Sequence, residues 1–386
     1  MKDRNQIYLD YQATTPLSSR VYDAMKPYYK DKFGNPHSNQ HFKGWESNEA
    51  VETSREQIAS SINADLSEII FTSGATESNN LAMLGIGLKN EQQRNKVLVS
   101  SIEHKCVLSA AQYLSEKGLN VIEVPVNEIG LVDLDFLEQH LDETVLIVSI
   151  MDVNNEIGTI QPINQISALC HRVGAIFHSD AAQSMTTKAI DVKRSNVDLL
   201  SLSAHKIYGP KGIGALYVEK SIKDRLQPLL LGGGQEQGLR SGTLPTPLCV
   251  GFGTAAEIIE SERQETILQI AELRNLFYEE LKNKRPEIKL IGPNLEDRHV
   301  SNLSICFNGY DAEDLISLLQ PKLAVSTGSA CTTGIPEPSH VLSALGLSSE
   351  DAKSIIRFSF GKYTERSDTI KATNILLQSL DKVDIR

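Results

Sequence analysis

The sequence is poor in cysteine and has no long apolar run. Its 386 residues include five cysteines, an odd number without a CxxC pair, which argues against a disulfide framework and against a zinc site. No apolar stretch reaches the roughly 18 residues that a membrane helix needs. The start Met-Lys-Asp-Arg-Asn-Gln lacks the apolar core of a signal peptide. We therefore expect a cytoplasmic protein that has reduced thiols and makes no contact with membranes.

Basic residues are also in the minority. Lysine and arginine number 38 against 49 aspartates and glutamates, so the formal net charge is -11. Extensive binding to nucleic acid requires a basic face, and we therefore expect no direct contact with nucleic acid. A nucleic-acid pathway that is reached through a partner protein stays open.

The middle of the chain alternates short apolar runs with amphipathic stretches, which is typical of a mainly parallel sheet flanked by helices, an α/β fold. The predicted strands are 68–72, 96–100, 121–124, 145–150, 175–178, 197–202 and 214–218, and the predicted helices are 47–62, 77–88, 107–117, 163–173 and 255–284. Because one core rarely serves so long a chain, we expect a second, smaller domain. It contains strands at 302–307 and 355–360 and helices at 311–319 and 366–380.

The most informative position is Lys206. The apolar run 197–202 predicts a buried strand, and Ser203, His205 and Lys206 follow it, ahead of several glycines. A lysine at the end of a buried strand, beside a hydroxyl and an imidazole, is a candidate Schiff-base lysine. Taken alone, a solvated lysine on a loop is the more common explanation.

Two earlier polar clusters follow strands at the edge where open parallel sheets bind ligands. The segment 73–80, which contains Ala75 and Thr76, opens a helix, and free amides at a helix N-terminus suit a phosphate. An ordinary helix cap is the alternative. His104 follows another strand and either stacks on a planar ring or caps a helix. Lys105 is a rival Schiff-base candidate without a comparable serine and glycine context.

Two later clusters complete the pattern. Asn155 follows the strand 145–150, and Asp180 and Gln183 follow the strand 175–178. A carboxylate at the end of a buried strand needs a cationic partner. A pyridinium nitrogen is such a partner, and Gln183 is placed to donate to a ring oxygen. Anion cradle, stacking imidazole, buried aspartate and Schiff-base lysine together predict a pyridoxal phosphate (PLP) site.

With these motifs, the sequence resembles the cysteine desulfurases, in the class-V aminotransferase group of fold-type-I PLP enzymes. The matching motifs are Tyr8–Pro16, Gly34–Ser38, Thr72–Asn79, Asn154–Gly158, His178–Gln183, Ser203–Lys206 and Arg240–Thr243. The segment 326–331 and its continuation to His340 are most similar to the NifS/IscS-like branch. The resemblance implies a large PLP-binding domain at 16–260. It also implies a small α+β domain, formed by 1–15 and 261–386, that carries a cysteine loop at about 325–340.

The resemblance also assigns roles to individual residues. Lys206 holds PLP, Asp180 pairs with its pyridine nitrogen, and His104 stacks on its ring and acts as a proton donor. The other cofactor contacts are Ala75, Thr76, Ser203 and His205 near the phosphate, Thr243 from the neighbouring subunit of a homodimer, and Asn155 and Gln183 at the ring hydroxyl and the substrate. Arg357 binds the carboxylate of L-cysteine, for which a bidentate guanidinium is suited, and Asn35 assists it.

The thiol that the resemblance makes catalytic is Cys331. Its neighbours are small, polar and turn-forming, which predicts a loop that moves. In the implied reaction the Lys206 amine removes the Cα proton, Cys331 attacks the substrate sulfur, and the resulting persulfide passes to a sulfur-acceptor protein while alanine leaves. The other thiols are Cys106, the runner-up, and Cys170, Cys249 and Cys306, which we expect to be buried.

Two departures from the family pattern concern the substrate mouth and the acceptor. His37 stands where a small side chain is more usual, and the sequence ends at Arg386 without the longer tail that helps dock the iron–sulfur scaffold in housekeeping relatives. The acceptor stays open between iron–sulfur assembly, nitrogenase maturation, tRNA thiolation and DNA phosphorothioation. The alternative function is a selenocysteine lyase or another class-V PLP enzyme, and the remote one is a non-catalytic docking protein.

Overall fold

The seven strands predicted in the first two thirds of the chain form one sheet. The computed structural model describes residues 6–90, 94–186, 188–327 and 339–382. The order across the sheet is β2 (Ile69–Thr72), β8 (Gly214–Val218), β7 (Leu199–Ser203), β6 (Ile176–Asp180), β5 (Val145–Ser149), β3 (Lys96–Ser100) and β4 (Asn120–Val124). Neighbouring strands are parallel except at β8, which runs antiparallel to β2 and β7. The prediction of a mainly parallel seven-stranded sheet is confirmed.

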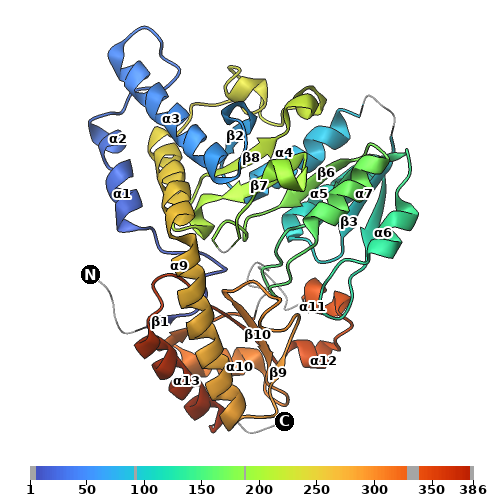
Figure 1. Ribbon diagram of the computed structural model, residues 1–386, viewed down its shortest axis with the longest axis vertical. Helices are drawn as coiled ribbons and strands as arrows, with labels where there is room; N and C mark the ends of the chain where they lie inside the picture. Colours follow the sequence, from blue (N-terminus) through green and yellow to red (C-terminus); the bar gives the residue numbers. More distant parts are fainter. Residues whose placement is uncertain (1–5, 91–93, 187, 328–338, 383–386) are drawn as a thin grey trace.

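Helices cover both faces of this sheet (Figure 1), as expected for strands such as β5, β6 and β7 that are buried along their whole length. α4 (Ala75–Leu88) and α5 (Lys105–Glu116) share one apolar cluster with side chains of the sheet. α3 (Phe42–Ser61), α7 (Ile163–Arg172) and the first part of α9 (Thr246–Lys284) contribute to a second cluster. Shorter helices of this part are α1 (Ser19–Met25), α2 (Pro27–Lys30), α6 (Leu134–His140) and α8 (Val192–Ser195).

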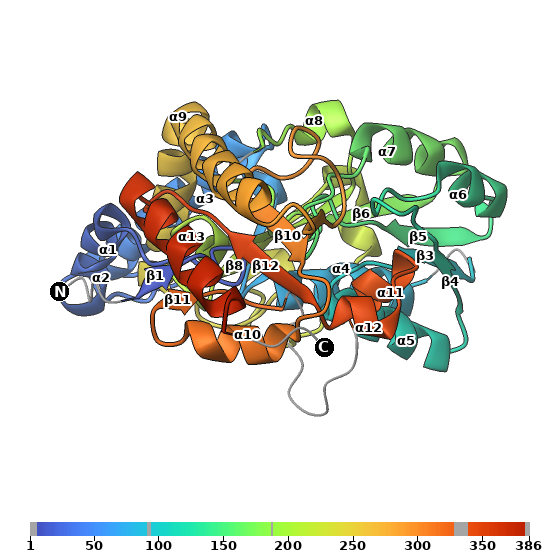
Figure 2. The same cartoon turned by 90° about the horizontal axis from the view of Figure 1, so that it is seen from below.

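The last third of the chain builds a smaller body around an antiparallel sheet. The strand order is β12 (Ile355–Ser359), β10 (Asn302–Cys306) and β9 (Lys289–Leu290). α13 (Arg366–Leu380) packs beside α9, and α10 (Ala312–Leu319) beside α13 (Figure 2). β1 (Ile7–Tyr8) joins this body by pairing with β11 (Leu323–Ala324). α11 (His340–Ala344) and α12 (Ser349–Ala352) complete it.

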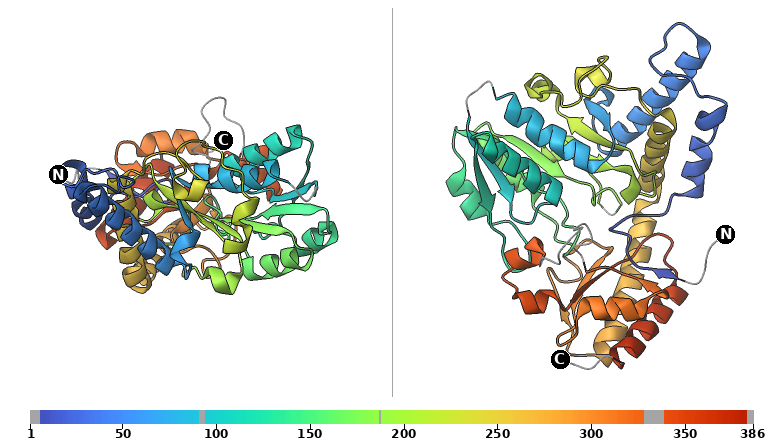
Figure 3. Two further views of the ribbon diagram at one scale, coloured as in Figure 1. Left: turned by 90° about the horizontal axis from the view of Figure 1, so that it is seen from above. Right: turned by 180° about the vertical axis from the view of Figure 1, so that it is seen from behind.

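The 39-residue helix α9 runs from the larger body into the smaller one (Figure 3). It begins nine residues before the predicted helix at 255–284, because Pro247 lies in its first turn, where a missing N–H costs nothing. Its early residues, such as Phe252, lie in a core of the larger body, and Phe277 lies in the separate core of the smaller body, which also contains Leu9. These separate cores support our proposal of two domains at 16–260 and at 1–15 with 261–386.

Candidate active site

Lys206 and Gln183 both donate a hydrogen bond to the same backbone carbonyl of the N-terminal segment, that of Gln12. It lies in a single turn of 3-10 helix, Ala204–Lys206, that follows β7. Its Nζ donates to the backbone oxygens of Gln12 and Ala13, the latter at 2.8 Å, and Gln183 Nε2 donates to the same Gln12 oxygen at 3.0 Å. The structure therefore brings Lys206 and Gln183 together. Gln12 and Ala13 belong to the motif 8–16, to which the sequence analysis gave no role.

Asp180 is the last residue of β6 rather than the second residue after a strand, and it is almost fully buried. Its Oδ2 accepts a hydrogen bond from Asn79 Nδ2 at 2.6 Å, and its Oδ1 accepts one from the Ala182 N–H at 2.9 Å. Asn79 was quoted only as part of a family motif. The signal that could have singled it out is its position in the first turns of a helix that follows a strand end, from which its side chain reaches Asp180.

His104 caps α5, as one of its two sequence interpretations expected. Its Nδ1 accepts from the Cys106 N–H at 3.2 Å and lies 3.0 Å from Cys106 Sγ. Asn79 Nδ2 also donates to that sulfur at 3.2 Å. A hydrogen-bonded path of side chains thus joins His104 to Asp180. Capping does not exclude stacking on a ring, which stays a prediction.

Next to His104 lies a buried acid that the sequence analysis missed. Glu103 is fully buried, and its Oε1 accepts from the Met151 N–H at 2.6 Å. Burial, followed by the nearby charge of Asp180, raises the pKa of Glu103 well above its usual range. This shift favours the protonated, neutral form of Glu103, whose side chain lies beside His104 and close to Asp180.

Three strand ends create a cradle for an anion. Thr72 and Ser203, the last residues of β2 and β7, both stand opposite Gly214. A Cβ at Gly214 would lie 2.6 Å from the Cα of Gly74, so this approach of two backbones requires glycine. Gly74 has a φ of 152° and begins α4 without a side-chain cap, which leaves the Ala75 and Thr76 turn open to an anion.

The hydroxyl and imidazole beside this cradle fit a phosphate. Ser203 Oγ is buried and has no hydrogen-bond partner among the residues that the structure describes. His205 Nδ1 lies 3.0 Å from Thr14 Oγ1, and burial, with the charges of Lys206 and Lys211, lowers the pKa of His205 to about 4. A buried hydroxyl without a partner costs stability, and a phosphate oxygen would satisfy it. The residues present therefore fit PLP.

Arg357 reaches the same region from the smaller body. It is buried on β12, and its Nη2 pairs with Asp10 Oδ1 at 2.7 Å while its Nη1 donates to the Asn155 carbonyl at 2.9 Å. The structure therefore places Arg357 beside Asn155, as the prediction of a shared substrate site requires. Asp10, which the sequence analysis did not single out, holds one arm of the guanidinium.

Thr243 and Asn35, two further predicted site residues, lie at the surface of the chain. Thr243 is exposed, although Arg240 anchors its segment to Glu77 of α4 at 2.8 Å. Asn35 is also exposed, and its Oδ1 accepts from the His37 N–H at 3.0 Å. Within the described part of the chain, neither side chain hydrogen-bonds to Lys206 or Arg357, so their roles stay predictions.

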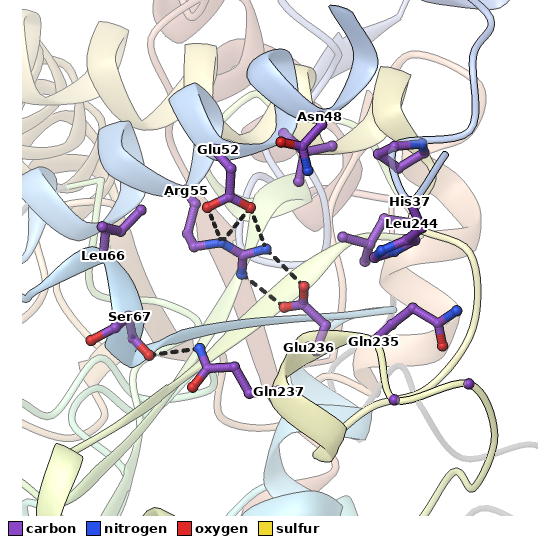
Figure 4. Close-up of a pocket in the computed structure, with 14 residues that line it drawn as sticks. His37, Asn48, Glu52, Arg55, Leu66, Ser67, Gln235, Glu236, Gln237 and Leu244 are labelled. Carbon is purple, nitrogen blue, oxygen red and sulfur yellow. Dashed lines mark hydrogen bonds and ion pairs between the residues drawn. The ribbon is translucent and has the colours of Figure 1, made fainter. Parts of the chain in front are cut away.

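A separate pocket of about 470 Å³ lies beside these two segments, lined by Pro36, His37 and residues 233–237 and 244. Among its lining residues, Arg55 is held by Glu236 at 2.7 Å and by Glu52 at 3.2 Å (Figure 4). Both oxygens of Glu236 are used by Arg55. The charge of Arg55 is therefore neutralised within the chain. Lys206 does not line this pocket, which is distinct from the Lys206 site.

Four of the five cysteines lie among the described residues. Cys170, Cys249 and Cys306 are buried, as predicted, and burial raises the pKa of each thiol, that of Cys306 to about 11. Cys106 is half-buried. Cys331 lies outside the described residues, and its assignment stays a prediction.

Comparison with known proteins places this site in context. The family model "Aminotransferase class-V" matches residues 7–371. A relative from Rickettsia typhi named "Cysteine desulfurase IscS" is 46% identical over 377 residues, which are 98% of this chain and 92% of the relative. A solved structure titled "NIFS-LIKE PROTEIN" has a TM-score of 0.91 and 36% identity, over 98% of this chain and 100% of that one. A structure titled "SspA in complex with cysteine" has a TM-score of 0.81 and 37% identity, over 93% and 100%.

Proposed function

Because the chain belongs to the class-V aminotransferase family and is a PLP-dependent cysteine desulfurase, we propose that Lys206 and Cys331 carry out its chemistry on L-cysteine. The observation that carries this proposal is the meeting of Lys206 and Gln183 at the Gln12 carbonyl, at the sheet edge where β6 ends in Asp180. The sulfur removed from L-cysteine passes to an acceptor protein.

Asp180, Ser203 and the first turn of α4 would hold the cofactor. PLP supplies an electron sink that stabilises the negative charge left at Cα when a proton is removed. Asp180 would face the ring nitrogen, and the buried Ser203 hydroxyl with the Ala75 and Thr76 turn would bind the phosphate. His205 stays neutral because of its low pKa, about 4, so it contributes a hydrogen bond rather than a charge.

The substrate would lie between the two bodies of the chain. Arg357 would bind its carboxylate, with Asn155 beside it and Asn35 assisting. The Lys206 amine would take the Cα proton, since it lies at the edge of β7 with its Nζ directed at residues 12 and 13. The thiolate of Cys331 would then attack the substrate sulfur. The carbon–sulfur bond breaks, a sulfur–sulfur bond forms on the enzyme, and the three-carbon fragment is protonated and leaves as alanine.

We also propose that the protein is a homodimer in which Thr243 completes the partner's site. Thr243 is exposed while its segment is tethered by the Arg240–Glu77 ion pair, so it is presented outward from the chain. Leu231, in the same segment, is 83% exposed. Packing of this segment against another subunit would remove that apolar side chain from water. A cytoplasmic location and an acceptor in iron–sulfur assembly, tRNA thiolation or DNA phosphorothioation remain part of this proposal. In the part of the chain that the structure describes, each helix is too short or too polar to span a membrane.

The decisive experiment compares wild type with Cys331→Ala. PLP-loaded protein is incubated with L-cysteine and a reductant, and sulfide and alanine are both measured. We expect equal amounts of the two products from wild type, and a loss of at least about 100-fold in the variant with an unchanged PLP spectrum, because the nucleophile is gone. Cys170→Ala, which removes a buried thiol, is the matched control and keeps full activity.

Equal activity of wild type and Cys331→Ala would overturn the assignment of Cys331. It would favour the alternative class, a lyase such as a selenocysteine lyase that needs no enzyme thiol. A yellow wild-type protein that forms no alanine even with an added sulfur acceptor would favour the remote alternative, a docking protein.

A further inference from the structure

Two side chains without a role so far, Asn79 and Cys106, connect the two residues proposed to contact the cofactor ring. Asn79 is fully buried, and its Nδ2 donates to Asp180 Oδ2 at 2.6 Å and to Cys106 Sγ at 3.2 Å. Cys106 Sγ in turn lies 3.0 Å from His104 Nδ1. The path joins β6 to the N-terminal turns of α4 and α5.

The direction of each hydrogen bond follows from its chemistry. An ionised carboxylate only accepts, so Asn79 must turn its nitrogen toward Asp180. The Cys106 backbone N–H only donates, and it points at His104 Nδ1 at 3.2 Å. Nδ1 is therefore the unprotonated nitrogen, and the neutral ring carries its proton on Nε2. The Cys106 thiol, which accepts from Asn79, donates its own hydrogen to Nδ1.

We propose that Asn79 and Cys106 are positioning residues that hold His104 in the tautomer with its proton on Nε2 and tie that ring to Asp180. The consequence for catalysis rests on the proposed function. A proton on Nε2 makes that nitrogen a donor toward the reacting groups, whereas the other tautomer would offer them a lone pair. The helix cap alone holds Nδ1 through one backbone N–H. The thiol is a second donor, which shares the single lone pair of Nδ1 and is itself fixed by a buried amide.

A double-mutant cycle tests whether Cys106 acts through His104. Loss of one neutral hydrogen bond predicts that Cys106→Ala lowers kcat about three- to tenfold with an unchanged KM for L-cysteine. Cys106→Ser keeps a donor and an acceptor and restores most of the rate. In a His104→Ala background, Cys106→Ala has no further effect. Cys170→Ala is the control for loss of a thiol. An equal loss in both backgrounds, or no loss in the first, overturns the proposal.

The tautomer is also measured without turnover. Nitrogen NMR of the PLP-loaded enzyme, labelled with ¹⁵N-histidine and assigned by comparison with His104→Ala, distinguishes protonated from unprotonated ring nitrogens. We expect the proton on Nε2 in wild type and in Cys106→Ser, and exchange between tautomers in Asn79→Leu and Cys106→Ala. A proton on Nδ1 in wild type overturns the proposal whatever the activity. The expected tautomer in an enzyme that does not desulfurate cysteine supports the proposal and contradicts the proposed function alone.

Discussion

At the scale of single residues, the pairing of Arg357 with Asp10 sets how the arginine can meet a carboxylate. Asp10 holds Nη2 at 2.7 Å and the Asn155 carbonyl holds Nη1 at 2.9 Å. In the role proposed for Arg357, an incoming substrate carboxylate would therefore share the guanidinium with Asp10. Because both partners are largely buried, loss of one leaves the other charge uncompensated.

We predict that Asp10→Asn destabilises the free enzyme by about 3 kcal/mol, since a buried arginine loses its counter-charge. The same change favours an added carboxylate, which no longer competes with Asp10. Thermal unfolding with and without L-alanine checks both effects. The rise in Tm on adding L-alanine should be larger in Asp10→Asn than in wild type, and a smaller rise would contradict this view of the pair.

A second residue-scale prediction concerns Glu103. Its pKa is raised well above 4.5 in the folded protein, so the folded state keeps a proton that the unfolded state loses. Stability is then fully present below pH 4.5 and falls by about 1.4 kcal/mol per pH unit until the folded pKa is reached. Glu103→Gln removes this dependence. Urea unfolding at several pH values should show that the free energy of unfolding of the variant rises relative to that of wild type as pH increases. Parallel curves would contradict the raised pKa of Glu103.

At the scale of elements, a polar row crosses the middle of the buried sheet. His178 on β6 is fully buried, its Nδ1 lies 2.8 Å from Ser149 Oγ on β5, and its Nε2 lies 3.0 Å from Ser201 Oγ on β7. Both ring nitrogens are thus engaged by hydroxyls, which a neutral imidazole satisfies as one donor and one acceptor. These hydrogen bonds link the three central strands at a position on β6 that lies two residues before Asp180.

Burial lowers the pKa of His178 from 6.5 to about 3, so the unfolded state binds a proton that the folded state refuses. Its contribution to stability is complete above pH 6.5 and is lost by about 1.4 kcal/mol per pH unit as pH falls toward 3. We predict that His178→Gln reduces the acid sensitivity of the free energy of unfolding by that slope. Denaturant unfolding between pH 7 and 5 measures it, and an unchanged slope would mean that His178 is already charged.

At the scale of the whole molecule, the exposed Thr243 predicts a site shared between two subunits. Lys206→Ala and Thr243→Asp should each be inactive as homodimers, the second because a carboxylate repels the phosphate. When the two variants are unfolded and refolded together, each mixed dimer contains one site with both residues intact. We expect activity to return to about a quarter of wild type, since half of the dimers are mixed and each has one working site. No recovery would place Thr243 in the site of its own chain.

Local sequence patterns were enough to predict the main elements and the strand ends that carry the candidate site residues. Alternation of apolar runs with amphipathic stretches is a local property, so the seven strands and helices such as α7 and α13 were predicted within a few residues. Short elements such as α6 and β9 were missed, because so few residues leave no clear period. Lys206 and Asp180 were predicted as site residues because parallel strands place their carboxyl ends at one edge.

Which distant residues meet Lys206 and Arg357 depends on the tertiary fold. Arg357 pairs with Asp10 across 347 positions, and Lys206 reaches Gln12 across 194. The bond from Asn79 to Asp180 spans 101 positions. These contacts depend on strand order and on how the smaller body packs against the sheet, and no local pattern encodes either. The same packing buries Glu103 completely, and it is burial, rather than residue type, that raises the pKa of this acid.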